Sequence, residues 1–538
     1  MNLRQRQIFR VIAVLALALS LAWLLVLPGF EPLITALMGL GGLLSARGGS
    51  GEPVAPGARS GPGGTSAGTP RKSIVVLPFD NLSPDPDDAY FSDGLSEELI
   101  TDLSKVSDLR VISRTSARLA KESGRSLREI GADLEVRYVL AGGVRKSGDD
   151  FRITVQLLDA ENDAHLWADR YDGVLGDVFD FQAEVSKSIV ESLGLTMALP
   201  QEETSAGRSR SSLVRDPRAY DCYVRAREEV WRCTRESLDR AVLLLGNGLR
   251  IVGEHASLQG MLGQAYWQYI NMAIHQDPEF LTKAEEAAVR ALELDDGLAL
   301  GHLVLGEVEW KRGRMAQAIG HMEHALRLDP NDPDALLTLA YVYSFVGRSS
   351  AGRPLIERLI SLDPLNPLNY GVRAYVDLFD GRKEAALESS WTMFEMDPES
   401  PAMRWIHTVM LAWNDRVDDS PWDLAWARNV TPQSTLEALC KVINLAVVND
   451  TAAVDVFTAD LQEKARWDEQ YSWLLAACYA KIGEVDLAMD WLENAVHRGF
   501  LNFPFLSADD PFLENLRTDS RFQALMKVVA DEWRTLQR

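Results

Sequence analysis

The sequence predicts a multidomain protein in which an N-terminal transmembrane helix precedes an α/β domain and an all-α superhelical solenoid. Three observations predict this architecture. Residues 11–27 form an uncharged apolar run, strand-like and helix-like patterns alternate through residues 71–197, and a 34-residue period runs through much of residues 216–538. The 538 residues also exceed what one hydrophobic core holds, so several domains are expected.

The N-terminal apolar run, VIAVLALALSLAWLLVL, is long enough for a short transmembrane helix, because about 1.5 Å of rise per residue gives a span of about 26 Å. Arg4, Arg6 and Arg10 precede the run. The positive-inside rule therefore predicts that residues 1–10 are cytoplasmic and that the bulk of the chain is extracytoplasmic, or periplasmic in a bacterium.

A cleaved signal peptide is the competing interpretation of this segment, with a small-residue cleavage site near Ala46. We favour an uncleaved anchor, because the apolar run is longer than a typical signal-peptide core. A second crossing by residues 33–46 is short and interrupted by glycines. Residues 28–70 are interpreted as a juxtamembrane segment followed by a flexible linker rich in Gly, Pro and Ser, and residues 198–215 as a second linker.

The elements of the α/β domain follow from its local patterns. Strands are predicted from short apolar or alternating runs at 73–79, 109–113, on both sides of a hairpin turn at 147–150, and at 165–173. Helices are predicted at 92–106, 126–134 and 181–195, the first with Ser92 and Asp93 as cap candidates. Two strand–helix units followed by a meander and a closing helix make an α/β domain.

Two long motifs in this domain carry a family resemblance. They are VLPFDNLSPDPDDAYFSDGLSEELITDLSKVSDLRVISRTS and REIGADLEVRYVLAGGVRKSGDDFRITVQLLDAENDAHLWADRYDG. Together they resemble the TolB amino-terminal domain family over nearly all of residues 73–195. The resemblance implies a binding and docking module, commonly followed by tetratricopeptide (TPR) repeats. In that family the domain often follows a membrane helix, and the membrane helix follows a cytoplasmic winged-helix regulator or a class III adenylate cyclase.

This chain departs from the family pattern at its N-terminus. Only ten residues precede the predicted membrane helix, so we expect no such output domain. Acidic residues in the domain could in principle serve acid–base or metal chemistry: Asp85, Asp87, Asp88, Asp93, Glu97 and Glu98. We favour helix capping and the favourable first helical turn for the last three, and therefore predict no catalytic residue and no cofactor.

The repeat region shows its period in two residue types. Asp-Pro pairs recur every 34 residues at 329–330, 363–364 and 397–398. A turn residue recurs with the same period: Gly313, Gly347, Gly381, Asp415, Asn449 and Gly483. Gly, Asp and Asn all tolerate the left-handed conformation that such a turn requires. A 34-residue unit of two helices is the TPR signature, and we count about seven or eight units, two of them weak.

TPR arrays bind partners on a concave face lined by the first helix of each unit. Groove positions of that family map here onto aromatic residues: Trp310, Tyr341, Phe345, Tyr375, Phe379, Trp405, Trp413 and Trp473. They are the candidates for a peptide groove. The alternative is that these rings pack between the helices, as aromatic stripes at helical spacing usually do.

Charge, cysteines and histidines add further constraints. The formal net charge of −23 argues against a nucleic-acid partner. Cys222 and Cys233 are expected on one helix and unpaired, whereas Cys440 and Cys478 are expected on neighbouring helices, close together but reduced. His321 and His324 make a possible metal pair without a third ligand, so solvated histidines are favoured and no metal site is predicted.

These observations lead to a membrane-anchored, non-catalytic scaffold or sensor that binds a protein or peptide. Its other partner is the membrane, through the N-terminal helix. Three alternatives stay open: an accessory subunit of an adenylate cyclase or transcriptional signalling system, a cryptic hydrolase or fragment of a cyclase system, and a binder of small apolar ligands in the aromatic groove.

Overall fold

The computed structural model describes residues 72–195 and 216–537, apart from positions 107, 149, 163, 175–176, 273, 276, 421–423 and 433. The predicted membrane helix at 11–27 and both predicted linkers lie outside these residues. Within them, no helix combines the length and the apolar character that crossing a membrane requires.

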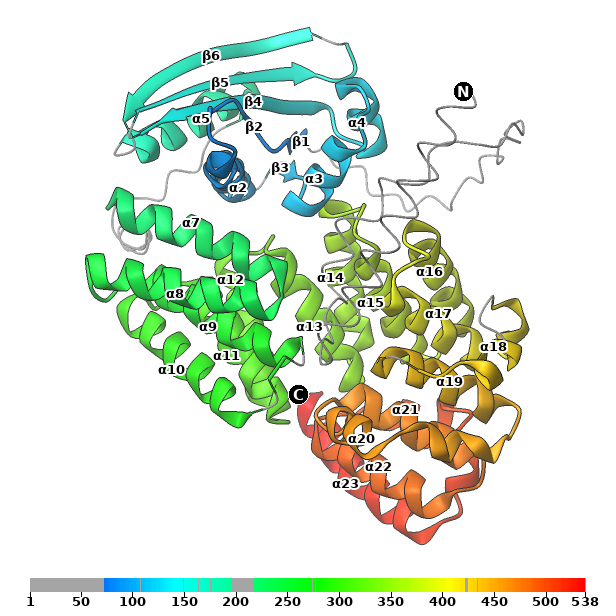
Figure 1. The fold of residues 1–538 in the computed structure, drawn as a ribbon. Helices are drawn as coiled ribbons and strands as arrows, with labels where there is room; N and C mark the ends of the chain where they lie inside the picture. Colours follow the sequence, from blue (N-terminus) through cyan, green and yellow to red (C-terminus); the bar gives the residue numbers. More distant parts are fainter. Residues whose placement is uncertain are drawn as a thin grey trace, which may run out of the picture. The chain divides into compact units, whose positions relative to one another are not determined.

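The N-terminal described domain is built on a sheet with the strand order β3–β1–β4–β5–β6, in which β2 also pairs with β4. Strand β1 runs parallel to β3 and β4, whereas β4, β5 and β6 form an antiparallel meander (Figure 1). The strands are β1 (Lys72–Val76), β2 (Asp80–Asn81), β3 (Leu109–Val111), β4 (Tyr138–Ser147), β5 (Asp150–Asp159) and β6 (Ala164–Val174).

Helices cover both faces of this sheet. Helices α2 (Ala89–Ser104) and α5 (Val178–Ser192) pack with Ile74 and Val76 on one face. Helices α3 (Arg114–Glu122) and α4 (Leu127–Asp133) pack with Val75 on the other. Successive side chains of a strand point to opposite faces, so the apolar run of β1 supplies both cores. The mixed α/β fold is confirmed.

Two local predictions in this domain were wrong. Helix α2 begins at Ala89 after Asp88, so Ser92 and Asp93 lie inside it rather than capping it. Helix α3 was not foreseen, because its sequence RTSARLAKE has only short apolar side chains on its buried face. Its start is nonetheless marked by Ser113, whose side chain accepts a hydrogen bond from the backbone of Ser116.

The remainder of the described chain is helical, as the 34-residue period predicts. The first helix of each unit begins 34 residues after the first helix of the preceding unit, at positions 299, 333, 367, 401, 435 and 469. The helices before and within these units are α7 (Pro217–Arg232), α8 (Arg235–Val252), α9 (Ala256–Asn271), α10 (Pro278–Leu294), α11 (Ala299–Lys311), α12 (Met315–Leu328), α13 (Pro333–Phe345), α14 (Ser349–Leu362), α15 (Pro367–Leu378), α16 (Lys383–Met396), α17 (Pro401–Trp413), α18 (Leu424–Asn429), α19 (Thr435–Val447), α20 (Ala459–Ala465), α21 (Glu469–Lys481) and α22 (Val485–His497), and α23 (Ser520–Leu536) follows.

The predicted turn conformation is confirmed in all six units. The residues with positive φ include Gly313, Gly347, Gly381 and Gly483, together with Asp415 at 54° and Asn449 at 55°. The second helices of the units that begin at 401 and 435 are degenerate, because α18 and α20 span only six and seven residues. Between α22 and α23 the chain leaves the repeat pattern, with short turns at Phe505–Asp509 and Glu514–Leu516.

Candidate functional site

The structure brings the eight aromatic groove candidates together. They form a ladder along the first helices of the units, with Trp310 and Tyr341 ring centroids 6.0 Å apart, Tyr341 and Tyr375 5.9 Å, and Tyr375 and Trp405 6.3 Å. Seven of the eight side chains are buried, and Tyr341 is partly buried. The burial shows that this inner face is not open in the described chain.

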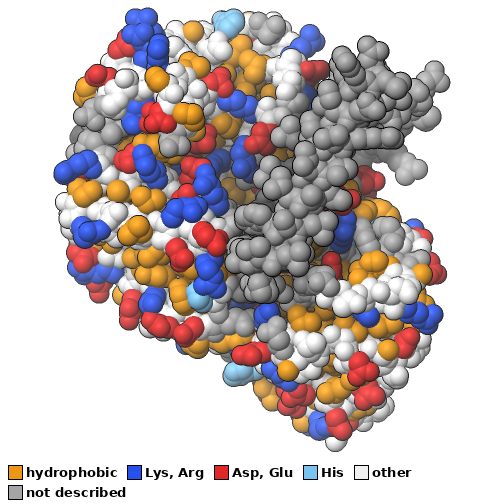
Figure 2. Space-filling view, viewed as in Figure 1, with side chains coloured by type: hydrophobic (Ala, Val, Ile, Leu, Met, Phe, Trp, Pro, Cys, Tyr) orange, Lys and Arg blue, Asp and Glu red, His pale blue; other side chains and the backbone are white. Residues whose placement is uncertain are grey.

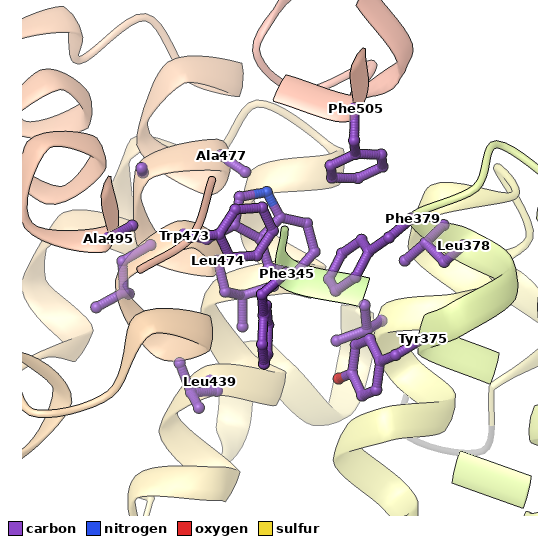
Figure 3. Packing of buried hydrophobic residues seen from close by; sticks show 14 of the residues in the cluster. Phe345, Tyr375, Leu378, Phe379, Leu439, Trp473, Leu474, Ala477, Ala495 and Phe505 are labelled. Atoms are coloured by element: carbon purple, nitrogen blue, oxygen red, sulfur yellow. The ribbon is translucent and has the colours of Figure 1, made fainter. Parts of the chain in front are cut away.

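The chain's own residues 498–519, which we name the C-terminal segment, cover much of that face. Phe500 lies 5.3 Å from Phe345 between ring centroids and stacks on Trp473 at 5.5 Å. Phe505 lies 4.9 Å from Phe379. In Figure 3 the ring of Phe379, at the end of α15, and the ring of Phe505, from the C-terminal segment, both approach Trp473 of α21.

Backbone groups fasten the C-terminal segment to the ends of two repeat helices. The Leu501 amide donates to the Phe345 carbonyl over 2.8 Å. The Asn502 side-chain amide donates to the carbonyls of Ser344 and Phe379, each over 3.0 Å. These carbonyls lie at the C-terminal ends of α13 and α15, where helices leave acceptors without a partner. The Ser344 carbonyl also accepts from the Gly347 amide at 3.3 Å, so the segment adds a second donor there.

A buried carboxylate completes this attachment. Asp510 accepts hydrogen bonds from the indole nitrogens of Trp413 at 3.1 Å and of Trp473 at 2.8 Å. Phe512 follows it and stacks on Trp413, with ring centroids 4.2 Å apart. Burial raises the pKa of Asp510 to about 6, although the hydrogen bond from Trp473 acts in the opposite direction.

The occupied inner face has an energetic consequence. Full burial of one Phe side chain contributes about 1.5–3 kcal/mol, and Phe500, Phe505 and Phe512 are all buried here. A peptide would reach the aromatic ladder around Trp473 only after this segment had left. The peptide-binding role of the eight aromatics stays a prediction, and the structure places them in a packed core.

An open groove lies on the outer side of the same region, between α23 and the Phe503–Ser507 turn. Its volume is about 550 Å³. Phe503, Phe522 and Met526 supply its apolar lining. The charged side chains along it are three cations and one anion: Arg517, Lys527, Arg534 and Asp531. This groove combines apolar surface with an excess of positive charge.

Two clusters of polar contacts attach the α/β domain to the array, and the Asn331 side-chain amide adds a hydrogen bond to the Ser104 carbonyl at 2.9 Å. At the first, Arg227 of α7 forms ion pairs with Glu97 at 3.2 Å and Glu98 at 3.0 Å on α2. The Tyr90 hydroxyl of α2 also donates to Asp221 of α7. The Arg227 side chain is only 9% exposed, so one cation faces two carboxylates in a largely dry setting, and Arg114 at 3.5 Å also pairs with Glu97.

The second attachment is a carboxylate at a helix N-terminus. Asp363, from the turn between α14 and α15, accepts hydrogen bonds from the Ser116 amide at 3.1 Å and the Ser116 hydroxyl at 2.7 Å. The Ser113 hydroxyl donates to the same oxygen, and the Ser113 amide donates to the Leu362 carbonyl over 2.8 Å. A helix N-terminus favours an anion, because its free amides point outward.

The first attachment accounts for two of the acidic residues singled out in the sequence, and an ion pair within the α/β domain accounts for a third. Glu97 and Glu98 pair with Arg227, and Asp88 pairs with Lys146 at 2.8 Å. Asp85 is exposed, and the Asp87 side chain is outside the described part of the chain. Burial raises the pKa of Asp93, which lies inside α2. The arrangement is that of a domain interface rather than of a paired acid and base.

The cysteines and histidines lie close to where the sequence placed them. All four thiols are free; Cys222 lies on α7, and Cys233 caps its C-terminus. Cys440 and Cys478 are buried on α19 and α21, which contact each other. In the described ranges, no group of three or more His, Cys, Asp or Glu side chains has an arrangement ready to hold a metal ion.

Sequence reasoning missed the C-terminal segment and both domain attachments. The segment has no period, so only its aromatic content, Phe500, Phe503, Phe505 and Phe512, hinted at burial. The attachments join residues more than a hundred positions apart, and no local pattern announces such pairs.

Figure 2 shows acidic and basic side chains interspersed on the face in view. The expected absence of a nucleic-acid partner stays a prediction.

Comparison with known proteins supports the two-part organisation. Residues 309–374 match a tetratricopeptide repeat family model, so the helical region contains TPR repeats. Residues 70–185 match the model of the second domain of HilA/YgeH-like transcriptional regulators. That match replaces the TolB assignment.

Two individual proteins are similar to parts of the chain. A Rhizobium meliloti (strain 1021) protein named "Putative adenylate cyclase 3" is 38% identical over 260 residues, which are 47% of this chain and 42% of that protein. The chain thus matches less than half of that relative's length. A thermophilic TPR protein of Thermus thermophilus is 17% identical, with a TM-score of 0.30 over 36% of this chain and 98% of its own. The chain therefore contains TPR repeats in its helical region and has an N-terminal α/β domain similar to the second domain of HilA/YgeH-like regulators.

Proposed function

We propose that the chain is a non-catalytic scaffold or sensor that binds protein partners through its repeat array and its α/β domain. The observation that carries this proposal is the attachment of the α/β domain to two separate parts of the array, through Arg227 and through Asp363. If a partner binds more tightly to one of two arrangements of the array, it favours that arrangement. The attached α/β domain then changes its arrangement as well. The TPR repeats support protein partners, because stacked repeats present an extended surface.

Affinity capture with the full-length chain as bait tests the scaffold proposal. We expect a captured protein that, once purified, binds the chain directly with a Kd in the micromolar range or tighter, which corresponds to about −8 kcal/mol. Loss of that direct binding after purification of both components would overturn the proposal.

The non-catalytic part of the proposal has its own test, because the Rhizobium meliloti relative is named as a cyclase. The full-length chain should form no cyclic AMP above background when it is incubated with ATP and Mg²⁺ or Mn²⁺. Cyclic AMP formation that scales with protein concentration would show catalysis and overturn this part.

We place the partner on the α23 groove and assign it one occupant, an acidic peptide segment that also carries apolar side chains. The groove is open, whereas the inner face is filled by the C-terminal segment. Arg517, Lys527 and Arg534 give it local positive charge within a chain of net charge −23. The Arg517 Nε atom is buried, and among the described residues it has no hydrogen-bond partner. A carboxylate near it would supply the missing acceptor.

A labelled peptide of alternating Glu and Leu residues, and a matched Lys and Leu peptide, test the groove. The acidic peptide should bind the full-length chain, and the double variant Lys527→Glu with Arg534→Glu should bind it about tenfold more weakly, since each exposed pair contributes up to about 1 kcal/mol. Arg521→Glu, on α23 but outside the groove, is the control. Preference for the Lys and Leu peptide would overturn this placement. It would also be overturned if the chain formed a dimer that the double variant abolished, because the groove would then hold a second copy of the chain.

We also propose that residues 11–27 anchor the chain with its N-terminus in the cytoplasm and its folded domains outside. Arg4, Arg6 and Arg10 before the apolar run support this orientation. Alkaline phosphatase fused to the C-terminus should be active, and a reporter that works only in the cytoplasm should be silent. The reverse result would sink the proposed topology.

Two alternative functions have specific support. The comparisons favour an accessory role in adenylate cyclase or transcriptional signalling, which would appear as capture of such a protein by the full-length bait. A small ligand on the inner face is favoured by a buried polar atom, Trp405 Nε1, that has no hydrogen-bond partner among the described residues. Buried polar groups normally have a partner.

A further inference from the structure

Three histidines of one repeat meet on neighbouring helices. His302 lies on α11, and His321 and His324 lie one helical turn apart on α12. The Nδ1 atoms of His302 and His321 are 3.5 Å apart. The ring of His324 stacks on that of His302, with centroids 4.1 Å apart and an interplanar angle of 14°. All three side chains are partly buried, which leaves solvent access to the cluster.

The distance between the two Nδ1 atoms suits a shared metal ion. Zn²⁺ takes nitrogen ligands at about 2.0–2.1 Å in a tetrahedral arrangement, which puts two of them about 3.3–3.4 Å from each other. The observed 3.5 Å separation between His302 Nδ1 and His321 Nδ1 needs almost no adjustment. Two imidazoles are thus already placed as neighbouring ligands.

A backbone carbonyl orients the first of these imidazoles. His302 Nε2 lies 3.3 Å from the carbonyl oxygen of Asp296. A carbonyl only accepts hydrogen bonds, so Nε2 carries the ring proton and Nδ1 keeps a lone pair directed toward His321. Metal-binding histidines usually have such a hydrogen bond from the other ring nitrogen.

The surroundings also favour the neutral imidazoles that metals require. Burial lowers the pKa of His302, and the nearby His324, His321 and Arg327 lower it further. Burial also lowers the pKa of His321, against the opposing influence of Glu309. Protonation of His302 and His321 is thus disfavoured, whereas a metal ion would use the same lone pairs.

We propose that His302, His321 and His324 form a site for a divalent ion of the late first-row transition metals, with Zn²⁺ as the reference ion. His302 and His321 bind through Nδ1. His324 leaves its stack by side-chain rotation to become the third ligand, which explains why the three are not already arranged around a metal position. Water completes the tetrahedron. The ion ties α11 to α12 within one repeat and stiffens it, independently of the proposed peptide groove.

Zinc titration of the full-length chain, purified without a histidine tag and stripped with EDTA, tests the site. We expect one Zn²⁺ per chain with a raised thermal midpoint, and no response to Mg²⁺, which prefers oxygen ligands. His302→Gln, His321→Gln and His324→Gln should each weaken Zn²⁺ binding at least tenfold. His497→Gln, which replaces an exposed histidine at the end of α22, should leave it unchanged.

Cobalt substitution gives a second readout that needs no variant. Co²⁺ bound by the wild-type chain should show the intense visible absorption of tetrahedral coordination, and Zn²⁺ should displace it. A weak octahedral spectrum would overturn the site, as would wild-type zinc affinity in His302→Gln or His321→Gln. Wild-type affinity in His324→Gln alone would overturn the three-ligand assignment.

Discussion

Single carboxylates fasten distant parts of this chain together. Asp363 receives three hydrogen bonds from the start of α3, and Asp510 receives two from indole nitrogens on α17 and α21. The 34-residue period predicts where Asp363 lies, because it belongs to a recurring Asp-Pro pair. It does not predict the partner, since Ser113 and Ser116 are 250 and 247 residues away. Local sequence patterns predict the position of a residue such as Asp363 in its turn, whereas its hydrogen-bond partners depend on how distant elements pack.

The pKa of Asp510 makes a prediction about stability and pH. Its pKa is about 6 in the folded chain against an ordinary value of 3.8. Between these two pH values the unfolded chain has lost the proton that the folded chain keeps, so the unfolding free energy falls as pH rises. The full effect is about 3 kcal/mol. Asp510→Asn should remove this contribution to the decrease of the unfolding free energy with rising pH.

Chemical denaturation at several pH values between about 4 and 7 measures this effect. The exposed neighbour Asp509 supplies the control, because Asp509→Asn should keep the wild-type dependence. The same fall in both variants would contradict the assignment. At every pH, Asp510→Asn also leaves the Trp473 indole N–H facing an amide donor, so its absolute stability is expected to be lower.

At the scale of elements, the repeat period accounts for the array and fails where the period ends. Each first helix starts where the 34-residue spacing puts it, and Asp415 and Asn449 adopt the predicted left-handed turn. The second helices α18 and α20 are shorter than the pattern suggests. The C-terminal segment was not predictable, because its turns have neither helical nor strand periodicity and are held by contacts with α13, α15 and α21.

Packing within one repeat can be tested at Ala325. This residue of α12 is almost fully buried in the core of the array, where we predict that it packs against α11, so Ala325→Leu overpacks that core. The substitution should lower the unfolding free energy by roughly 1–3 kcal/mol. Because stacked repeats depend on their neighbours, faster hydrogen exchange should also appear in α13.

Ala316→Leu is the matched control for this prediction. Ala316 lies on the same helix but is exposed, so its replacement should change stability by no more than about 0.5 kcal/mol. Equal midpoints for the two variants in a denaturant titration would mean that α12 does not use Ala325 as its contact with α11.

At the scale of the whole described chain, ion pairs join elements that are far apart in sequence. Lys311 of α11 pairs with Asp468 and Glu469 at the start of α21, which links the first and last full-length repeats of the periodic region. Arg227 links α7 to α2. The sequence predicted the α/β domain and the repeat array, but not that contacts fasten these two parts together. Charged residues occur throughout the sequence, and only the folded chain shows which ones meet.

The ion pairs of Arg227 give the last prediction. Arg227→Ala would leave Glu98, whose side chain is 15% exposed, without its cation, and Glu97, 17% exposed, with only Arg114 at 3.5 Å. Removing one partner of a buried ion pair costs about 3–5 kcal/mol, because the remaining charge stays poorly solvated. The loss should appear in the unfolding free energy and as faster hydrogen exchange in both α2 and α7.

Arg232 on the same helix is the control, since it pairs with Glu228 and Glu229 but is 52% exposed. Arg232→Ala should cost about 0–1 kcal/mol, because exposed ion pairs contribute little. Adding Glu97→Gln and Glu98→Gln to Arg227→Ala should restore part of the stability, as the uncompensated charges are then gone. If Arg227→Ala cost no more than Arg232→Ala, the α/β domain would not be held through this ion-pair cluster, and its attachment to the array would have to depend on the remaining contacts, such as Tyr90 with Asp221, Asn331 with Ser104 and Ser116 with Asp363.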